Sequence, residues 1–174
     1  MNTKLVIFDL DGVIIDSREL HYKALNDALG QISKDYVISR EEHLSTFDGL
    51  PTTKKLWMLT EKKGLNPDLY NEIWSLKQEA TKNALLDLPI DIKLMEIFSH
   101  LKGRGIKIAV ASNSIRETIK ITLLQKGLMK FVDCYYSNED VIRSKPNPEM
   151  YYRCMIKLGE SAKETIIIED SHTG

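Results

Sequence analysis

The chain has 174 residues, of which 43% are apolar, which is enough for one domain or for one core with a small inserted domain. Lysine and arginine number 24 against 25 acidic residues, which gives a formal net charge of -1. This balance argues against nucleic-acid binding and against a basic membrane-binding surface. The first apolar run is broken by aspartates too early for a membrane span or a signal peptide.

The two cysteines, Cys134 and Cys154, have neither metal-binding nor redox-motif spacing. They are typical of reduced, buried thiols. We therefore expect a cytoplasmic protein.

Four short apolar runs rich in β-branched residues predict buried strands. They are Lys4–Phe8, Ile106–Ala111, Val132–Tyr136 and Thr165–Ile168. Amphipathic helical patterns over residues 92–101, 116–127 and 147–158 separate the later runs. Strands that alternate with helices indicate an α/β fold whose core is a Rossmann-like parallel sheet.

A long stretch after the first predicted strand has helical patterns in place of strands. These patterns cover residues 20–29, 54–63 and 69–85. We expect an inserted α-helical cap domain of residues 16–87, and a core formed by residues 1–15 and 88–174. Trp57 and Trp74 are expected in the core of this cap.

Polar side chains follow every predicted strand. Because ligands bind at the carboxyl ends of parallel strands, we expect these side chains to converge at one edge of the sheet. They are Asp9 and Asp11, then Ser112 and Asn113, then Lys145 beyond a loop, and finally Glu169 and Asp170.

This combination of side chains suits phosphoryl transfer. Clustered carboxylates repel one another unless a cation binds, and oxygen ligands favour Mg²⁺. A carboxylate can attack phosphorus to give an aspartyl-phosphate, while a lysine and a hydroxyl hold the phosphoryl oxygens. An aspartate two residues further on can protonate the leaving oxygen and later activate water. The residues therefore predict a magnesium-dependent enzyme that acts on phosphate esters.

Each of these residues also has a plainer interpretation. Asp9 and Asp11 are common residue types in a turn after a strand. Ser112 could cap the following helix, a role that is compatible with phosphate binding. Lys145 alone would be an ordinary surface lysine, and Glu169 could be only an electrostatic neighbour of the other acids.

Four ordered motifs carry a family resemblance. The run Phe8-Asp9-Leu10-Asp11-Gly12-Val13 resembles the first motif of the haloacid dehalogenase-like hydrolase superfamily. The second, third and fourth motifs are similar to Ala111-Ser112-Asn113-Ser114, Ser144-Lys145-Pro146-Asn147-Pro148 and Ile166-Ile167-Ile168-Glu169-Asp170-Ser171. All four motifs occur in order, each after its expected strand.

The resemblance implies a role for each matching residue. It makes Asp9 the nucleophile and a Mg²⁺ ligand, and Asp11 the general acid/base, with a backbone carbonyl that also binds the metal. It further implies phosphate binding by Ser112, a bridge from Lys145 to nucleophile and phosphate, metal binding by Asp170 and Glu169, and a supporting contact from Asn113.

The helical insert resembles the cap of the subgroup with β-phosphoglucomutase, phosphoglycolate phosphatase and several sugar phosphatases. In that subgroup the cap closes over the substrate and excludes water. His21 matches a residue of the first cap helix, and Gly49 belongs to a loop similar to the cap substrate loop. Both are candidates for substrate contact, although an exposed or core position for His21 is an equal alternative.

The sequence favours a phosphatase for a small phosphorylated metabolite, with a sugar phosphate as the expected substrate. The first alternative is a β-phosphoglucomutase-type mutase, which usually needs an arginine in the cap loop; residues 49–54 contain none. The second alternative is an inactive fragment, because family members continue beyond the fourth motif with a helix and usually another strand. On this interpretation the C-terminal part of the core is missing.

Overall fold

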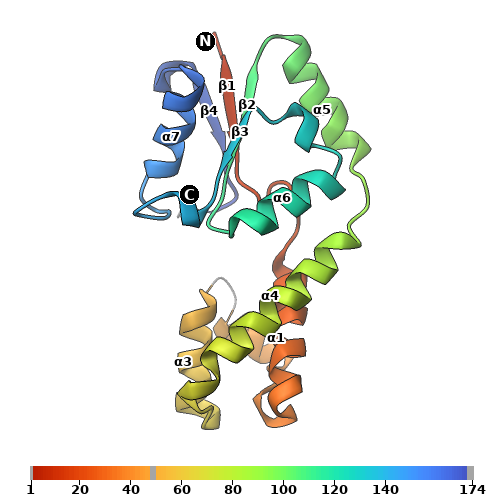
Figure 1. The fold of residues 1–174 in the computed structure, drawn as a ribbon, viewed down its shortest axis with the longest axis vertical. Helices are drawn as coiled ribbons and strands as arrows, with labels where there is room; N and C mark the ends of the chain where they lie inside the picture. The colour runs from red at the N-terminus through yellow and green to blue at the C-terminus, as the bar shows by residue number, and fades with distance from the viewer. Residues whose placement is uncertain (1, 48–49, 172–174) are drawn as a thin grey trace. The chain divides into compact units, whose positions relative to one another are not determined.

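The computed structural model describes residues 2–47 and 50–171 (Figure 1). The chain divides into two compact units. Residues 1–17 and 85–174 form one unit, the core unit, and residues 18–84 form the other, the cap unit.

A four-stranded parallel sheet is the centre of the core unit, with the strand order β3-β2-β1-β4. Strand β1, Leu5–Phe8, is fully buried, and it pairs with β2, Lys107–Ala111, on one side. Its other neighbour is β4, Thr165–Ile168, while β3, Cys134–Tyr136, pairs with β2. The predicted α/β fold with a parallel sheet is confirmed.

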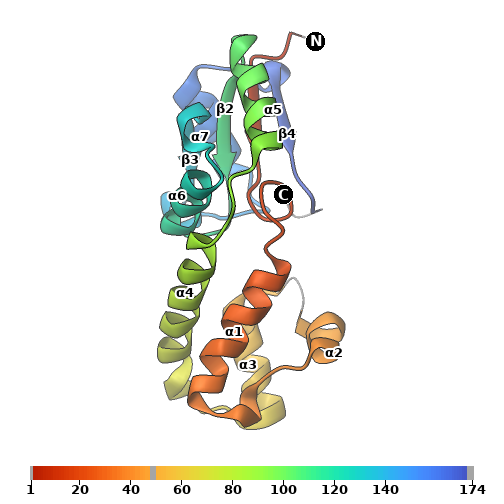
Figure 2. The same cartoon turned by 90° about the vertical axis from the view of Figure 1, so that its right-hand side faces the viewer.

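Helices cover both faces of this sheet, as Figures 1 and 2 show. Helix α7, Glu149–Leu158, packs against one face, where its Met150 and Cys154 join Leu5 and Ala109 in a buried cluster. Helix α5, Ile92–Gly103, covers the other face, where the rings of Phe98 and Phe8 are 4.7 Å apart. The alternation of side chains along a strand produces these two apolar faces. The remaining core-unit helices are α6, Arg116–Gln125, and the short helices η4, Met129–Phe131, η5, Asn138–Asp140, and η6, Ala162–Glu164.

The described residues of the cap unit form helices and their connections, as the sequence predicts. In chain order these helices are α1, Arg18–Ile32; η1, Lys34–Tyr36; α2, Arg40–Glu42; η2, His43–Phe47; α3, Thr52–Lys63; η3, Pro67–Leu69; and α4, Tyr70–Leu86, which runs into the core unit. Their apolar faces share one buried cluster that includes Leu29, Phe47 and Leu59. The expectation for the tryptophans was wrong: Trp57 is 57% exposed and Trp74 is 43% exposed. Both lie outside the apolar stripes of their helices.

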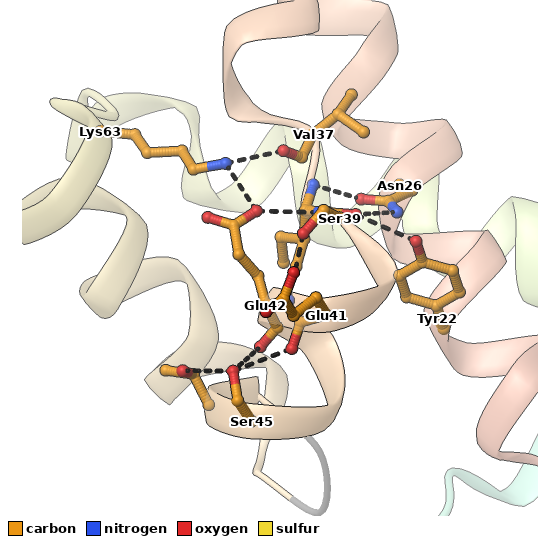
Figure 3. Close-up of polar contacts among 10 residues, drawn as sticks. Tyr22, Asn26, Val37, Ser39, Glu41, Glu42, Ser45 and Lys63 are labelled. Atoms are coloured by element: carbon orange, nitrogen blue, oxygen red, sulfur yellow. Dashed lines mark hydrogen bonds and ion pairs between the residues drawn. The ribbon is translucent and has the colours of Figure 1, made fainter.

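Polar contacts secure the segment between α1 and α2 (Figure 3). The side-chain amide of Asn26 donates to the carbonyl of Ile38 and accepts from its amide, both at 2.8 Å. Ser39 and Glu42 form a capping box at the start of α2, and Lys63 reaches Glu42 from α3. The capping box satisfies backbone groups that the short helix leaves unpaired, and Asn26 satisfies the backbone of Ile38 before it.

Strand β4 is one of the two outer strands of the sheet in the described residues. Its isoleucines 166, 167 and 168 remain 39–44% exposed, in contrast to the fully buried β1. Among residues 2–47 and 50–171, none of the helices has both the length and the apolar character that a membrane crossing requires.

Candidate active site

The candidate site lies at the carboxyl ends of β1, β2 and β4. Asp9 follows β1 directly, and its amide donates to the carbonyl of Ile168 at 2.9 Å, which ties it to the end of β4. The amide of Ser112, after β2, donates to the carbonyl of Tyr136 at 3.1 Å. Parallel pairing therefore brings residues that are far apart in sequence to one edge of the sheet.

Lys145 joins two of the predicted acids. Its Nζ lies 2.8 Å from Asp9 Oδ1 and 2.5 Å from Glu169 Oε1. All three side chains are largely buried, with exposed fractions of 5% for Lys145, 10% for Asp9 and 12% for Glu169. The lysine thus reaches the predicted nucleophile across 136 positions of sequence. One cation neutralises one of two adjacent carboxylates, and the site keeps an excess negative charge.

Burial and the shared lysine shift the three titrating groups in different ways. Burial raises the pKa of Asp9 to about 6, although Lys145 acts in the opposite direction. Burial lowers the pKa of Lys145, but Asp9 and Glu169 together outweigh that effect and leave it raised. Burial alone would raise the pKa of Glu169, yet the hydrogen bond from Lys145 leaves it lowered. At neutral pH the site therefore holds an ammonium between two carboxylates.

Asp9, Glu169 and Asp170 form a group that fits a metal ion. Each offers a carboxylate oxygen, and these oxygens lie within 4.8 Å of one another. Gly12 borders this group with φ +82°, and a Cβ placed there would come within 2.0 Å of Asp170 Oδ2. Only glycine accepts both this backbone conformation and this close approach. An oxygen-only donor set beside such a tight turn suits a small, hard divalent cation.

Ser114 connects the other predicted acid to the predicted phosphate-binding serine. Its Oγ donates to Asp11 Oδ2 at 2.9 Å, and its amide donates to Ser112 Oγ at 3.0 Å. Ser112 is fully buried. Since its oxygen accepts from Ser114, the hydroxyl proton of Ser112 is still available to a further acceptor. We did not predict Ser114 as a site residue, although it stands within the run Ser112-Asn113-Ser114.

Asn113 contacts the main chain of Lys145. Its Oδ1 accepts from the Lys145 amide at 3.0 Å, and its Nδ2 donates to the Lys145 carbonyl at 3.3 Å. The loop that carries Lys145 is therefore held to the end of β2. This geometry gives Asn113 a supporting contact, at the base of the lysine.

Tyr151 was also absent from the predicted site. The sequence places it on the apolar face of a helix, and it does lie in the buried cluster of α7. Its hydroxyl, however, donates to Glu169 Oε1 at 3.1 Å. Helical periodicity gives no sign of such a contact, because it reports which face is buried and not what the polar tip of a tyrosine reaches.

The two remaining candidate residues belong to the cap unit. His21 is a half-buried residue of α1 in the cap unit. Gly49 lies outside the described residues. Their predicted contact with substrate stays a prediction.

Comparisons with known proteins agree with this architecture. A family model for haloacid dehalogenase-like hydrolases matches residues 6–174. The fructose-1-phosphate phosphatase YqaB of Escherichia coli is 26% identical over 169 residues, which cover 97% of this chain and 87% of that protein. The pyrophosphatase PpaX of Oceanobacillus iheyensis is 25% identical over 172 residues, which cover 99% and 77%. The solved β-phosphoglucomutase of Clostridium difficile shares the fold, with a TM-score of 0.77 and 21% identity, over 99% of this chain and 78% of that one.

Proposed function

Because the chain belongs to the haloacid dehalogenase-like hydrolase family, we propose that it is a magnesium-dependent phosphatase that forms an aspartyl-phosphate on Asp9. The single observation that carries this proposal is the buried contact of Asp9 with Lys145 at 2.8 Å. Asp9, with a pKa of about 6, is ionised at neutral pH and available as a nucleophile. Lys145 carries the positive charge that a transferred phosphoryl group needs beside it.

Asp9, Glu169 and Asp170 would hold Mg²⁺, together with the backbone carbonyl of Asp11. Their carboxylate oxygens lie within 4.8 Å of one another, and the site has one lysine for these acids. Bound there, Mg²⁺ would neutralise charge on the phosphoryl oxygens and orient the phosphate ester.

The chain's own residues account for both proton transfers. An Asp9 oxygen attacks phosphorus, the ester bond breaks, and Asp11 gives its proton to the leaving alcohol oxygen. Asp11 then takes a proton from a water molecule, which attacks the phosphorus of the aspartyl-phosphate. This second step releases inorganic phosphate and restores the Asp9 carboxylate. The hydrogen bond from Ser114 orients Asp11, and the hydroxyl of Ser112 donates to a phosphoryl oxygen.

A sugar phosphate is the substrate class that we propose. One relative is named for fructose-1-phosphate, and another is named as a pyrophosphatase. The cap unit would exclude water from the bound ester, with His21 and Gly49 as candidate contacts to the substrate. Cap loop residues 49–54 contain no arginine, which favours transfer of the phosphoryl group to water over transfer to a second sugar position. A cytoplasmic location stays a prediction from the two cysteines.

The test is a panel assay of the purified protein with and without Mg²⁺. The panel contains fructose 1-phosphate and other sugar phosphates, phosphoglycolate, nucleoside monophosphates and pyrophosphate. A parallel assay with β-glucose 1-phosphate and a bisphosphate primer tests for mutase activity. We expect release of inorganic phosphate from at least one ester in the presence of Mg²⁺, and loss of that release in EDTA.

Asp9→Asn is the decisive variant, and Asp27→Asn, at an exposed position of α1, is its matched control. We expect Asp9→Asn to lose at least about a thousandfold in kcat, because the amide is a poor nucleophile. Acid-quenched wild-type protein should carry phosphate on residue 9 by mass spectrometry. Full activity of Asp9→Asn would overturn the mechanism, and a panel without any hydrolysed ester would overturn the function.

A further inference from the structure

Tyr151 lies directly behind the Lys145–Glu169 pair. It is 6% exposed, and its Oη donates to Glu169 Oε1 at 3.1 Å. The Nζ of Lys145 lies 5.1 Å from the centre of its ring, within range of a cation–π contact. The one tyrosine therefore contacts both groups that adjoin Asp9. The proposed phosphoryl and proton transfers give Tyr151 no role.

The hydroxyl of Tyr151 restricts the orientation of Glu169. Glu169 Oε1 accepts from Lys145 Nζ at 2.5 Å as well as from Tyr151, while Oε2 accepts from the amide of Ser171 at 3.3 Å. Donors on both oxygens resist rotation of the carboxylate. A tyrosine hydroxyl keeps its proton at neutral pH, so it remains a donor to Glu169.

Tyr151 itself is held in the buried core of the core unit. It belongs to the buried cluster in which α7 packs on Leu5, Ile7 and Ala109 of the sheet. A lysine side chain, in contrast, has many rotamers and loses conformational entropy when it is fixed in one position. A rigid aromatic wall and a fixed carboxylate would hold the lysine before the substrate arrives.

We propose that Tyr151 is a positioning residue that aligns the Lys145 ammonium with Asp9, through its hydroxyl on Glu169 and its ring beneath Lys145. It touches neither the phosphate nor the reacting atoms. This inference rests on the proposed function, because it explains how the phosphatase keeps its lysine in place.

Tyr151→Phe tests the hydroxyl, and Tyr152→Phe is a matched control. Tyr152 is the next residue of the same helix, and it is 56% exposed. We expect Tyr151→Phe to lower kcat about tenfold, the size expected for one hydrogen bond to a charged group. KM should stay within about twofold, because the lost bond does not reach the substrate. A kcat equal to that of Tyr152→Phe would overturn the proposal.

A double-mutant cycle with Glu169→Ala distinguishes a positioning role of Tyr151 from general support of the fold. If Tyr151 acts through Glu169, Tyr151→Phe should change kcat less than about twofold in a chain that already carries Glu169→Ala. Additive losses would mean that Tyr151 supports the structure independently of Glu169, and they would contradict the proposal. Both single variants and the double variant are compared with wild type at the same Mg²⁺ concentration.

A chemical labelling experiment tests the proposal without an activity assay. Lys145 is 5% exposed, so reductive methylation should modify it slowly in the metal-free wild type and in Tyr152→Phe. We expect modification in Tyr151→Phe to be at least about threefold faster, measured by peptide mass spectrometry. Lys4, whose side chain is 48% exposed, provides the internal reference for reagent strength.

Equal methylation rates of Lys145 in the two variants would overturn the positioning role. The two proposals can therefore fail separately. If the wild type hydrolyses no ester, the proposed function fails, and the labelling rates still decide whether Tyr151 holds Lys145.

Discussion

The ion pairs at the strand ends of the core unit and two ion pairs of the cap unit differ in how far they are buried. In the core unit, Lys145, Asp9 and Glu169 are 5%, 10% and 12% exposed. In the cap unit, Lys63 and Glu42 are 22% and 43% exposed, and Arg40 and Glu19 are 53% and 46% exposed. The charged groups of the two cap pairs keep much of their contact with water. Folding removes most of the water from Lys145, Asp9 and Glu169.

This difference in burial indicates the position of the site better than the identity of any single residue does. An exposed ion pair contributes about 0–1 kcal/mol, so its presence says little about function. A buried charge costs several kcal/mol unless its partners compensate for it. Such a cost is tolerated where chemistry requires the charge. For these ion pairs, the contrast points to the strand ends of the core unit.

Removal of the Lys145 ammonium, which Asp9 and Glu169 share, should have the largest effect on activity and stability. Lys145→Met leaves Asp9 and Glu169 buried without their common partner, so we expect kcat to fall at least about a thousandfold. The free energy of unfolding should fall by about 3–5 kcal/mol, as it does when one partner of a buried ion pair is removed. Phosphate release and urea unfolding measure the two effects. An unfolding midpoint equal to that of the wild type would show that the buried charges do not depend on Lys145.

Gly12→Ala should have the next largest effect, because the added Cβ would overlap Asp170. We expect Mg²⁺ affinity, measured by calorimetric titration, to fall at least about tenfold when Asp170 is displaced. Gly105→Ala is the matched control: its φ is also positive, at +75°, but a Cβ there meets nothing within 4 Å. Both variants should lose about 1–2 kcal/mol of stability from the backbone. The idea fails if the two variants bind Mg²⁺ equally well.

The buried carboxyl of Asp9 should give the metal-free protein a distinctive pH dependence. Its pKa is about 6 in the folded chain against 3.8 for an ordinary aspartate, so the folded state binds the proton more tightly. The Asp9 contribution to the free energy of unfolding should therefore fall as pH rises from about 4 to 6, by on the order of 3 kcal/mol.

Glu169, whose pKa is lowered, contributes in the opposite direction, so the Asp9 effect is best isolated by difference. Urea unfolding in EDTA at several pH values should show that Asp9→Asn gains stability relative to wild type as pH rises through this range. A difference that is constant with pH would contradict the raised pKa.

The smallest effect should come from the cap unit. Arg40 pairs with Glu19 and lies 5.2 Å from the ring centre of Tyr22, but its side chain is 53% exposed. We expect Arg40→Ala to lower the free energy of unfolding by less than about 1 kcal/mol. The measured change should shrink further in 1 M salt, because screening weakens exposed pairs. A loss as large as that of Lys145→Met would remove the distinction between the two units.

Most of the fold could be predicted because its strands are short apolar runs rich in β-branched residues. Strand β1 and strand β4 stand out as unbroken apolar runs. Strand β3 has only half-buried residues, so its signal is weak, and the structure shortens it to Cys134–Tyr136. The rule that ligands bind at strand ends then leads to Asp9, Lys145 and Glu169 without knowledge of any distance.

The remaining features depend on contacts that a linear pattern does not encode. Ser114 bonds to Asp11 across 103 positions of sequence. Asn113 contacts the backbone of Lys145, and its residue type alone would fit a helix cap equally well. Tyr151 obeys the apolar periodicity of α7 while its hydroxyl contacts Glu169. In each case a three-dimensional neighbour, and not the local sequence, decides which partner a polar group finds.

The central place of β1 has a consequence for how the molecule assembles. Leu5 is made first, yet its partners across the sheet are Lys107 and Thr165, which leave the ribosome about 100 and 160 residues later. Pairings over such separations are slow, because the chain loses entropy before the contacts form. Asp9 therefore meets Lys145 and Glu169 only after well over a hundred further residues have been made. Hydrolytic activity should appear only after these long-range pairings have formed.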